Sequence, residues 1–307
     1  MRWREKLILL AAEPTYLGAV TLDASHYQRA MDFQITFEEE AIQDEVEQGY
    51  EGAVEDIPTG EHVTLGYKTH FFASGVAGTA PPYADALLAC RLAEVVDAGV
   101  SVSYVLAADD GGSAAAHVRI GKNLHAIAGM RGKVDIVMEK GIPMLQWQFK
   151  GTWAAPTHQV SALPAVDNAP WLLFKPTGPG RTSNCSLHGQ AVRPYSLSLS
   201  TGNEPLYDES LVDSQIVFSD RNASGKIQIE APTLDQINFF SRASNRQHGP
   251  LTIQHGQTAG ETATINCLNV QIKKPQYVKL DNGNVGHDID LKLLPDAGND
   301  EIELVFT

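Results

Sequence analysis

Hydrophobic and polar residues alternate along most of the chain with a period of two. Clear examples are Asp32–Phe37, Val134–Met138, Met144–Phe149, Tyr195–Leu199, Lys226–Ile229 and Asp288–Leu293. Successive side chains of a strand point to opposite faces, so this period predicts strands with one buried and one polar face. Glycine-containing turns at 139–141 and 281–284 separate neighbouring segments, which is typical of β-hairpins. The pattern therefore predicts a chain dominated by antiparallel sheet.

Two segments have a helical period instead. Pro82–Val96 places Leu87, Leu88, Leu92 and Val95 on one face, and Pro232–Ala243 begins with a possible capping box between Thr233 and Gln236. We therefore expect an α+β chain that is mainly β, with one helix in each half.

The order of the expected elements occurs twice. Each half has a strand, a long loop, a second strand, a helix, further strands and a final hairpin. A duplication with a whole domain as its period is the simplest explanation. We expect a first domain at 1–155, a proline-rich linker at 156–194 and a second domain at 195–307, each domain an antiparallel β-sandwich or barrel with one flanking helix. In the linker, Trp171–Phe174 could add one strand to a neighbouring sheet.

Composition limits the class of protein. A chain of 307 residues with 43% hydrophobic residues can bury one large core or two ordinary ones. Its apolar runs, such as Leu7–Ala12, are far too short to cross a bilayer, so no membrane insertion is expected. The three cysteines, Cys90, Cys185 and Cys267, are an odd number at wide spacings, which suits assembly in a reducing cytoplasm rather than a disulfide framework.

Negative charge is concentrated in one segment. The net charge is −14, and the segment Glu38–Asp56 contains nine acids and no base. Two interpretations stay open and are compatible: a solvated mobile loop, or an interaction loop that becomes ordered late. Under the second, we expect a contact with the adjacent ring of an assembly, made by Glu38, Glu39, Glu40, Ile42, Asp44, Glu45, Val46, Glu47, Glu51, Glu55 and Asp56.

No motif for catalysis is present. The sequence contains no nucleophile elbow, no zinc-protease motif, no phosphate-binding loop and no dinucleotide fingerprint. The ten histidines are dispersed, and 281–284 lacks the ligand series of a calcium loop. We therefore expect no enzyme activity, no metal and no cofactor.

Several ordered segments resemble the major tail tube proteins of bacteriophages with long, non-contractile tails, in particular the two-domain members. The segments that carry this resemblance are Asp56–Gly60, Ala77–Tyr83, Leu87–Cys90, Glu230–Leu234, His255–Gly260 and Leu294–Glu301. The resemblance implies a structural virion protein, assembled in the host cytoplasm, whose sheets join into rings that stack into a hollow tube for DNA. It also implies contacts with other tail proteins, namely the tape measure protein in the lumen, the terminator and the distal tail protein.

Two further expectations follow. Because single-domain members form rings of six, two domains in one chain suggest a trimeric ring with pseudo-sixfold symmetry. An acidic wall would repel phosphates and let DNA slide. A different class, a β-sandwich binding module for carbohydrate or a receptor, would be favoured by exposed aromatic platforms.

Overall fold

The computed structural model describes residues 5–44, 46–47, 49–109, 111–161 and 163–307. The strands of the first half are β1 (Lys6–Ala12), β2 (Tyr27–Gln28), β3 (Met31–Gln43), β4 (Asp56–His70), β5 (Leu92–Asp97), β6 (Ser101–Leu106), β7 (Ala114–Ile120), β8 (Asn123–Met138), β9 (Met144–Thr152) and β10 (Thr157–His158). Those that follow are β11 (Thr182–Leu187), β12 (Gln190–Ala191), β13 (Pro194–Ser200), β14 (Asn203–Glu209), β15 (Ser214–Arg221), β16 (Ser224–Glu230), β17 (His248–His255), β18 (Ala263–Ile272), β19 (Gln276–Lys279), β20 (Val285–Leu294) and β21 (Glu303–Phe306). The helices are α1 (Ala84–Leu88), α2 (Phe239–Ser244) and the 3-10 turns η1 (Ala24–His26) and η2 (Ala169–Leu172).

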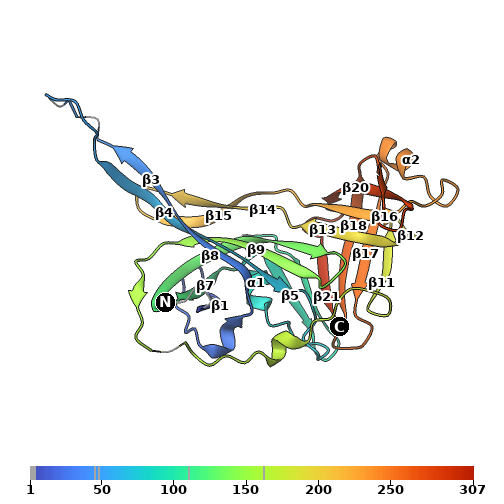
Figure 1. The fold of residues 1–307 in the computed structure, drawn as a ribbon, viewed down its shortest axis with the longest axis horizontal. Coiled ribbons are helices and arrows are strands. Elements are labelled where there is room, and N and C mark those ends of the chain that lie inside the picture. Colours follow the sequence, from blue (N-terminus) through green and yellow to red (C-terminus); the bar gives the residue numbers. More distant parts are fainter. Residues whose placement is uncertain (1–4, 45, 48, 110, 162) are drawn as a thin grey trace.

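The prediction of a mainly β chain is confirmed: the strands form a large antiparallel sheet, accompanied by two short α-helices (Figure 1). The period-two segments all lie in strands. The sandwich or barrel form of each half stays a prediction.

Both helices are shorter than the sequence pattern indicates. The segment predicted as the helix Pro82–Val96 is helical only at α1, and Arg91 then takes a left-handed φ of 61°. From Leu92 onward it is β5, which pairs with β6, since sheet pairing and two β-branched valines outweigh the helical spacing. In the predicted helix Pro232–Ala243, regular α-helix begins only at α2, where Asn238 caps the amide of Ser241 at 2.9 Å.

The same order of paired strands occurs in both halves. In the first half β3 pairs with β4, β4 with β9, and β9 with β8. In the second half β13 pairs with β16, β16 with β20, and β20 with β19. A helix follows the second strand of each set, which is the order that the sequence repeat predicts.

The two sets are joined edge to edge within the chain. β8 pairs with β13, with Leu197 opposite Met138 and Ser200 opposite Asp135. β21, at the end of the chain, pairs with β6 of the first half. The boundaries at 1–155, 156–194 and 195–307 stay a prediction, but the middle segment contains β10, β11 and β12.

One aromatic residue of that segment belongs to the core. The sequence suggested a strand at Trp171–Phe174, but this is wrong: Trp171 lies in η2, where Pro170 stands in the first turn. Its indole is buried and packs on the rings of Tyr83, Phe72 and Tyr27. Burial of this large ring holds the segment against the first half.

The sequence also predicted a loop between the first two strands of the second half, and this too is wrong. These residues form the hairpin β14–β15, which lies over the first half (Figure 1). Ile216 is fully buried there. Its backbone N–H donates to Tyr16 Oη at 2.6 Å, and Arg131 donates to its carbonyl at 2.8 Å. The ring of Tyr207 stacks on His62 at 4.8 Å.

Candidate assembly surface

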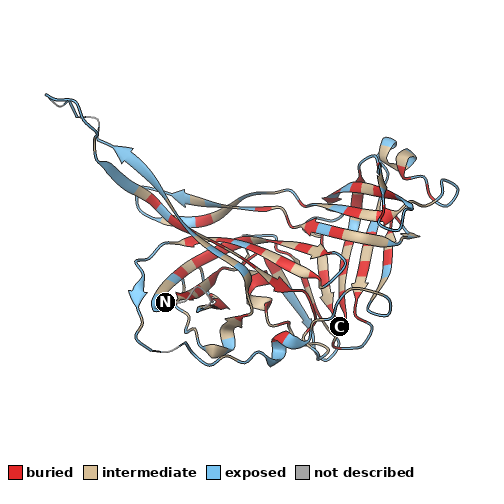
Figure 2. Ribbon diagram, viewed as in Figure 1, coloured by how far each residue is buried: buried red, intermediate tan, exposed pale blue. Residues whose placement is uncertain are grey.

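A long acidic hairpin projects from the body of the molecule. We call its outer part, residues 39–61, the arm; it is the continuation of β3 and β4 beyond the opposed pair Glu38 and His62. The arm stands clear of the rest of the chain, and almost all of its described residues are exposed (Figures 1 and 2).

The structure corrects the prediction of a loop from Glu38 to Asp56. Residues 38–43 and Asp56 are in strands, and the acids and apolar residues of the predicted contact loop are therefore distributed over a hairpin and its tip. Those in β3 or β4 are Glu38, Glu39, Glu40, Ile42 and Asp56, and those at the tip are Asp44, Val46, Glu47, Glu51 and Glu55. Glu45 lies outside the described residues. The predicted contact itself stays a prediction.

Pairing in the arm follows the hydrophobic pattern. Ile42 lies opposite Ile57 and Gln43 opposite Asp56, and the Gln43 amide donates to the Asp56 carboxylate at 2.8 Å. Ile42 is therefore a cross-strand partner and not part of a loop. Gly60, with a φ of 63°, allows the register shift at the base of the arm.

Polar contacts fix the base of the arm. Glu38 accepts a hydrogen bond from Thr64 at 2.6 Å, and its other oxygen lies 2.9 Å from His62 Nε2. The Thr64 hydrogen bond lowers the pKa of the Glu38 carboxyl, and the charges of Lys150 and His62 act in the same direction. The base is therefore ordered, while the outer part has few contacts of its own.

The arm exposes apolar side chains that water disfavours. Ile42 is 59% exposed, Ile57 51% and Tyr50 73%, and Val46 is exposed beside them. A two-stranded hairpin with nothing packed on it is only marginally stable in water. Exposed apolar side chains on an otherwise acidic hairpin make the arm a candidate contact surface.

The outer strand at one end of each set has an open edge. Over the described residues, β3 pairs only with β4, and β19 pairs only with β20. An unpaired edge presents a row of backbone donors and acceptors to any strand that can align with it. In the order of the two strand sets, β3 is equivalent to β13 and β19 is equivalent to β8, and β8 and β13 are the strands that pair within the chain.

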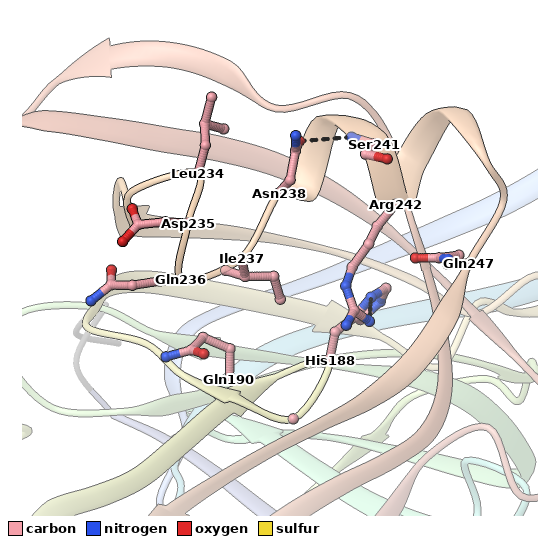
Figure 3. A pocket seen from close by; sticks show the side chains of 11 residues that line it. His188, Gln190, Leu234, Asp235, Gln236, Ile237, Asn238, Ser241, Arg242 and Gln247 are labelled. Carbon is pink, nitrogen blue, oxygen red and sulfur yellow. Dashed lines mark hydrogen bonds between the residues drawn. The ribbon is translucent and has the colours of Figure 1, made fainter.

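One pocket of the second half is lined by few reactive side chains. It has a volume of about 420 Å³ and is lined by His188, Arg242 and polar residues around α2 (Figure 3). Burial lowers the pKa of His188, whose Nε2 lies 2.9 Å from the Val270 carbonyl, and Arg242 approaches its Nδ1 at 3.5 Å. Ser241 Oγ in the same pocket accepts a hydrogen bond from Asn245 Nδ2 at 3.2 Å.

The remaining reactive groups are dispersed or buried. Cys90, Cys185 and Cys267 are all buried, and burial raises the pKa of the last two to about 12, far from a reactive thiolate. In the part of the chain that the structure describes, no group of three or more His, Cys, Asp or Glu could hold a metal ion.

One small aromatic surface is relevant to the binding-module alternative. Tyr277 is 67% exposed, and its ring lies 5.5 Å from that of Phe240. Sequence reasoning did not identify this pair, because its two residues are far apart in the chain. Neither described α-helix is long and apolar enough to cross a membrane.

Comparisons with protein-family models and with curated proteins find no match to this sequence.

Proposed function

We propose that this chain is a structural subunit that joins copies of itself edge to edge into rings, and that the rings stack into the hollow tail tube of a long-tailed bacteriophage. The resemblance of the ordered sequence segments to tail tube proteins gives the biological setting. The open strand edges and the acidic arm support self-assembly.

The observation that carries the proposal is the junction between β8 and β13. It joins the fourth strand of one set to the first strand of an equivalent set. The first strand of the first set is β3, and the last strand of the second set is β19. The outer edges of both strands are open in the described structure. A second copy can therefore repeat outside the chain the junction that exists inside it.

Such a contact is heterologous, because a β19 edge meets a β3 edge. Heterologous contacts close into rings when the rotation between subunits allows it. Three chains would supply six strand sets, and closing them would pair the open edges of β3 and β19 around the ring. The resulting barrel is wide enough in principle for a water-filled channel, as in other barrels of many strands.

The sheet has a polar side opposite its core, as a subunit of a tube requires. Ser196, Ser198 and Ser200 of β13 lie on the side opposite the buried Leu197 and Leu199. The net charge of −14 would weaken adhesion of phosphates to the wall. No catalytic group is needed for this role.

Proline substitutions on β3 test the proposal. Neighbouring residues of a strand direct their N–H groups to opposite sides, so one of Thr36→Pro and Phe37→Pro removes an amide from the open edge. The proline that removes an N–H on the open side breaks no hydrogen bond to β4, so that variant should keep the melting temperature of the parent. This variant is the one to test for assembly. We expect it to fold and to form no rings by electron microscopy; rings in normal yield would contradict edge-to-edge assembly.

Carbohydrate binding is the second candidate, favoured by the exposed ring of Tyr277 beside Phe240. If a sugar ring stacks on this pair, the Tyr277→Ala variant should bind the sugar less tightly, and the Tyr50→Ala variant should bind it as tightly as the parent. Binding to a glycan array by a monomeric chain would favour this candidate over the assembly proposal.

A further inference from the structure

The two hairpins inserted in the two halves occupy equivalent positions. The arm leaves the first half beyond the opposed pair Glu38 and His62, and β14–β15 leaves the second half beyond the opposed pair Ser200 and Ser224. Figure 1 shows both extending toward the same end of the molecule. Only β14–β15 has a surface beneath it, namely the preceding strand set.

The seat of β14–β15 can be described by rows of opposed residues. The first row is His62 of β4, which stacks on Tyr207, and Thr152 of β9 opposite it. The second row lies two residues further along and joins Thr64 of β4, Lys150 of β9 and Arg131 of β8. Arg131 is the residue that donates to the hairpin carbonyl of Ile216. The seat therefore combines a flat polar surface with a cation that binds hairpin backbone.

The same rows exist in the second strand set. We aligned the two halves at the points where their hairpins leave the sheet. The opposed pair Ser224 and Lys292 then corresponds to the pair His62 and Thr152. The next pair on the same face, Lys226 and Asp290, corresponds to Thr64 and Lys150. The amide of Lys273 donates to the Asp290 carbonyl, so this lysine stands in the position of Arg131. We call the surface around Lys226, Lys273 and Lys292 the lysine face.

We propose that the arm of one copy lies across the lysine face of the copy whose β19 edge pairs with its β3. This inference rests on the proposed assembly and names the partner of the arm: a second copy of this chain in the same ring. All three lysines are exposed. Lys226 and Lys273 form ion pairs with Asp288 and Asp290, so Lys292 carries the positive charge that these two pairs do not offset.

Charge and polarity of the two surfaces are complementary. The arm offers Glu47, Glu51 and Glu55 near its tip with no base in the segment, and the lysine face offers ammonium groups on flexible stems. Aliphatic lysine stems can cover exposed apolar groups such as Ile42 and Ile57 while their charged ends reach carboxylates. The inference differs from the expectation that the arm contacts the adjacent ring.

Cross-linking distinguishes the two. The natural cysteines are buried, so Glu51→Cys combined with Lys292→Cys provides two accessible thiols, which a short bismaleimide joins in assembled protein. If the arm binds within its own ring, the ladder on a denaturing gel ends at the number of chains in one ring. A ladder that continues to larger species, or no ladder in assembled protein, would overturn the inference.

Charge reversal provides a second test. We expect Lys226→Glu with Lys292→Glu to raise the concentration needed for assembly about tenfold, and added Glu47→Lys with Glu51→Lys to restore it. Lys122→Glu with Lys140→Glu makes the same change in net charge at exposed positions away from the face and should have little effect. Equal effects of both lysine pairs would contradict the inference, whereas a parent chain that never assembles would refute the proposed function itself.

Discussion

The arm and the hairpin β14–β15 are equivalent insertions with opposite surroundings. Ile216 of β14–β15 is fully buried, whereas Ile42 and Ile57 of the arm are more than half exposed. β14–β15 is held by Tyr16 and Arg131 of the same chain, and the arm has only its own cross-strand contacts beyond the base. One hairpin has its partner surface in the chain, and the other presents a surface for which a partner must be supplied.

Under the proposed assembly, this difference divides the junctions of the ring into two kinds. The first half provides the seat for the hairpin of the second half, so folding of the subunit completes one junction of the series. The next junction can form only between chains. Interactions at the first kind of junction should govern stability, and those at the second kind should govern oligomerisation.

The largest expected effect is on subunit stability. Ile216→Ala removes a fully buried side chain and should lower the free energy of unfolding by about 2–4 kcal/mol. Ile42→Ala, the same chemical change in the arm, should cost less than about 0.5 kcal/mol in the isolated subunit. Urea unfolding of both variants measures this, and equal losses would show that the arm is packed on its own chain.

The second expected effect is on assembly alone. Deletion of Ala41–Glu55, closed by an Asn-Gly turn, should leave the melting temperature of the subunit within about 3 °C of the parent. Tubes should be lost or shortened, because the acidic and apolar contact residues have been removed. A variant that forms tubes of normal length and stability would mean that the arm is a solvated extension with no role in assembly.

The smallest expected effect depends on pH. The lowered pKa of Glu38 means that its ionised form is favoured in the folded state, so its contribution is present above the ordinary value of 4.5 and is lost as the pH falls below it. Because solvent reaches this partly exposed carboxyl and screens its charge, we expect Glu38→Gln to cost only a few tenths of a kcal/mol at pH 7. The difference from the parent should disappear near pH 3 in thermal melts, and a growing difference there would contradict the assignment.

The sequence pattern predicted the strands well because their alternation reflects burial of one face. It predicted the extent of the helices poorly: Leu92 and Val95 have helical spacing with Leu88, but their pairing with β6 is a contact between separate segments. The predicted acidic segment does coincide with the most exposed projection of the molecule. Its strand pairing was missed, because charge masked the cross-strand partners Ile42 and Ile57.

Other features could not be predicted from local patterns. The junction of β8 with β13 and the burial of Ile216 depend on how distant segments meet. Ile216, Val217 and Phe218 form a short apolar run, which is a weak strand signal inside a segment rich in Asp, Glu and Ser. The open edges become visible only when the complete pairing is known.

Electron microscopy of the purified chain, with the number of chains per ring determined from the density, tests the central claim most directly. We predict rings of three chains in which β19 of each subunit lies beside β3 of the next, stacked into tubes. A monomer at all concentrations, a two-fold dimer, or a ring in which these edges remain unpaired would contradict it.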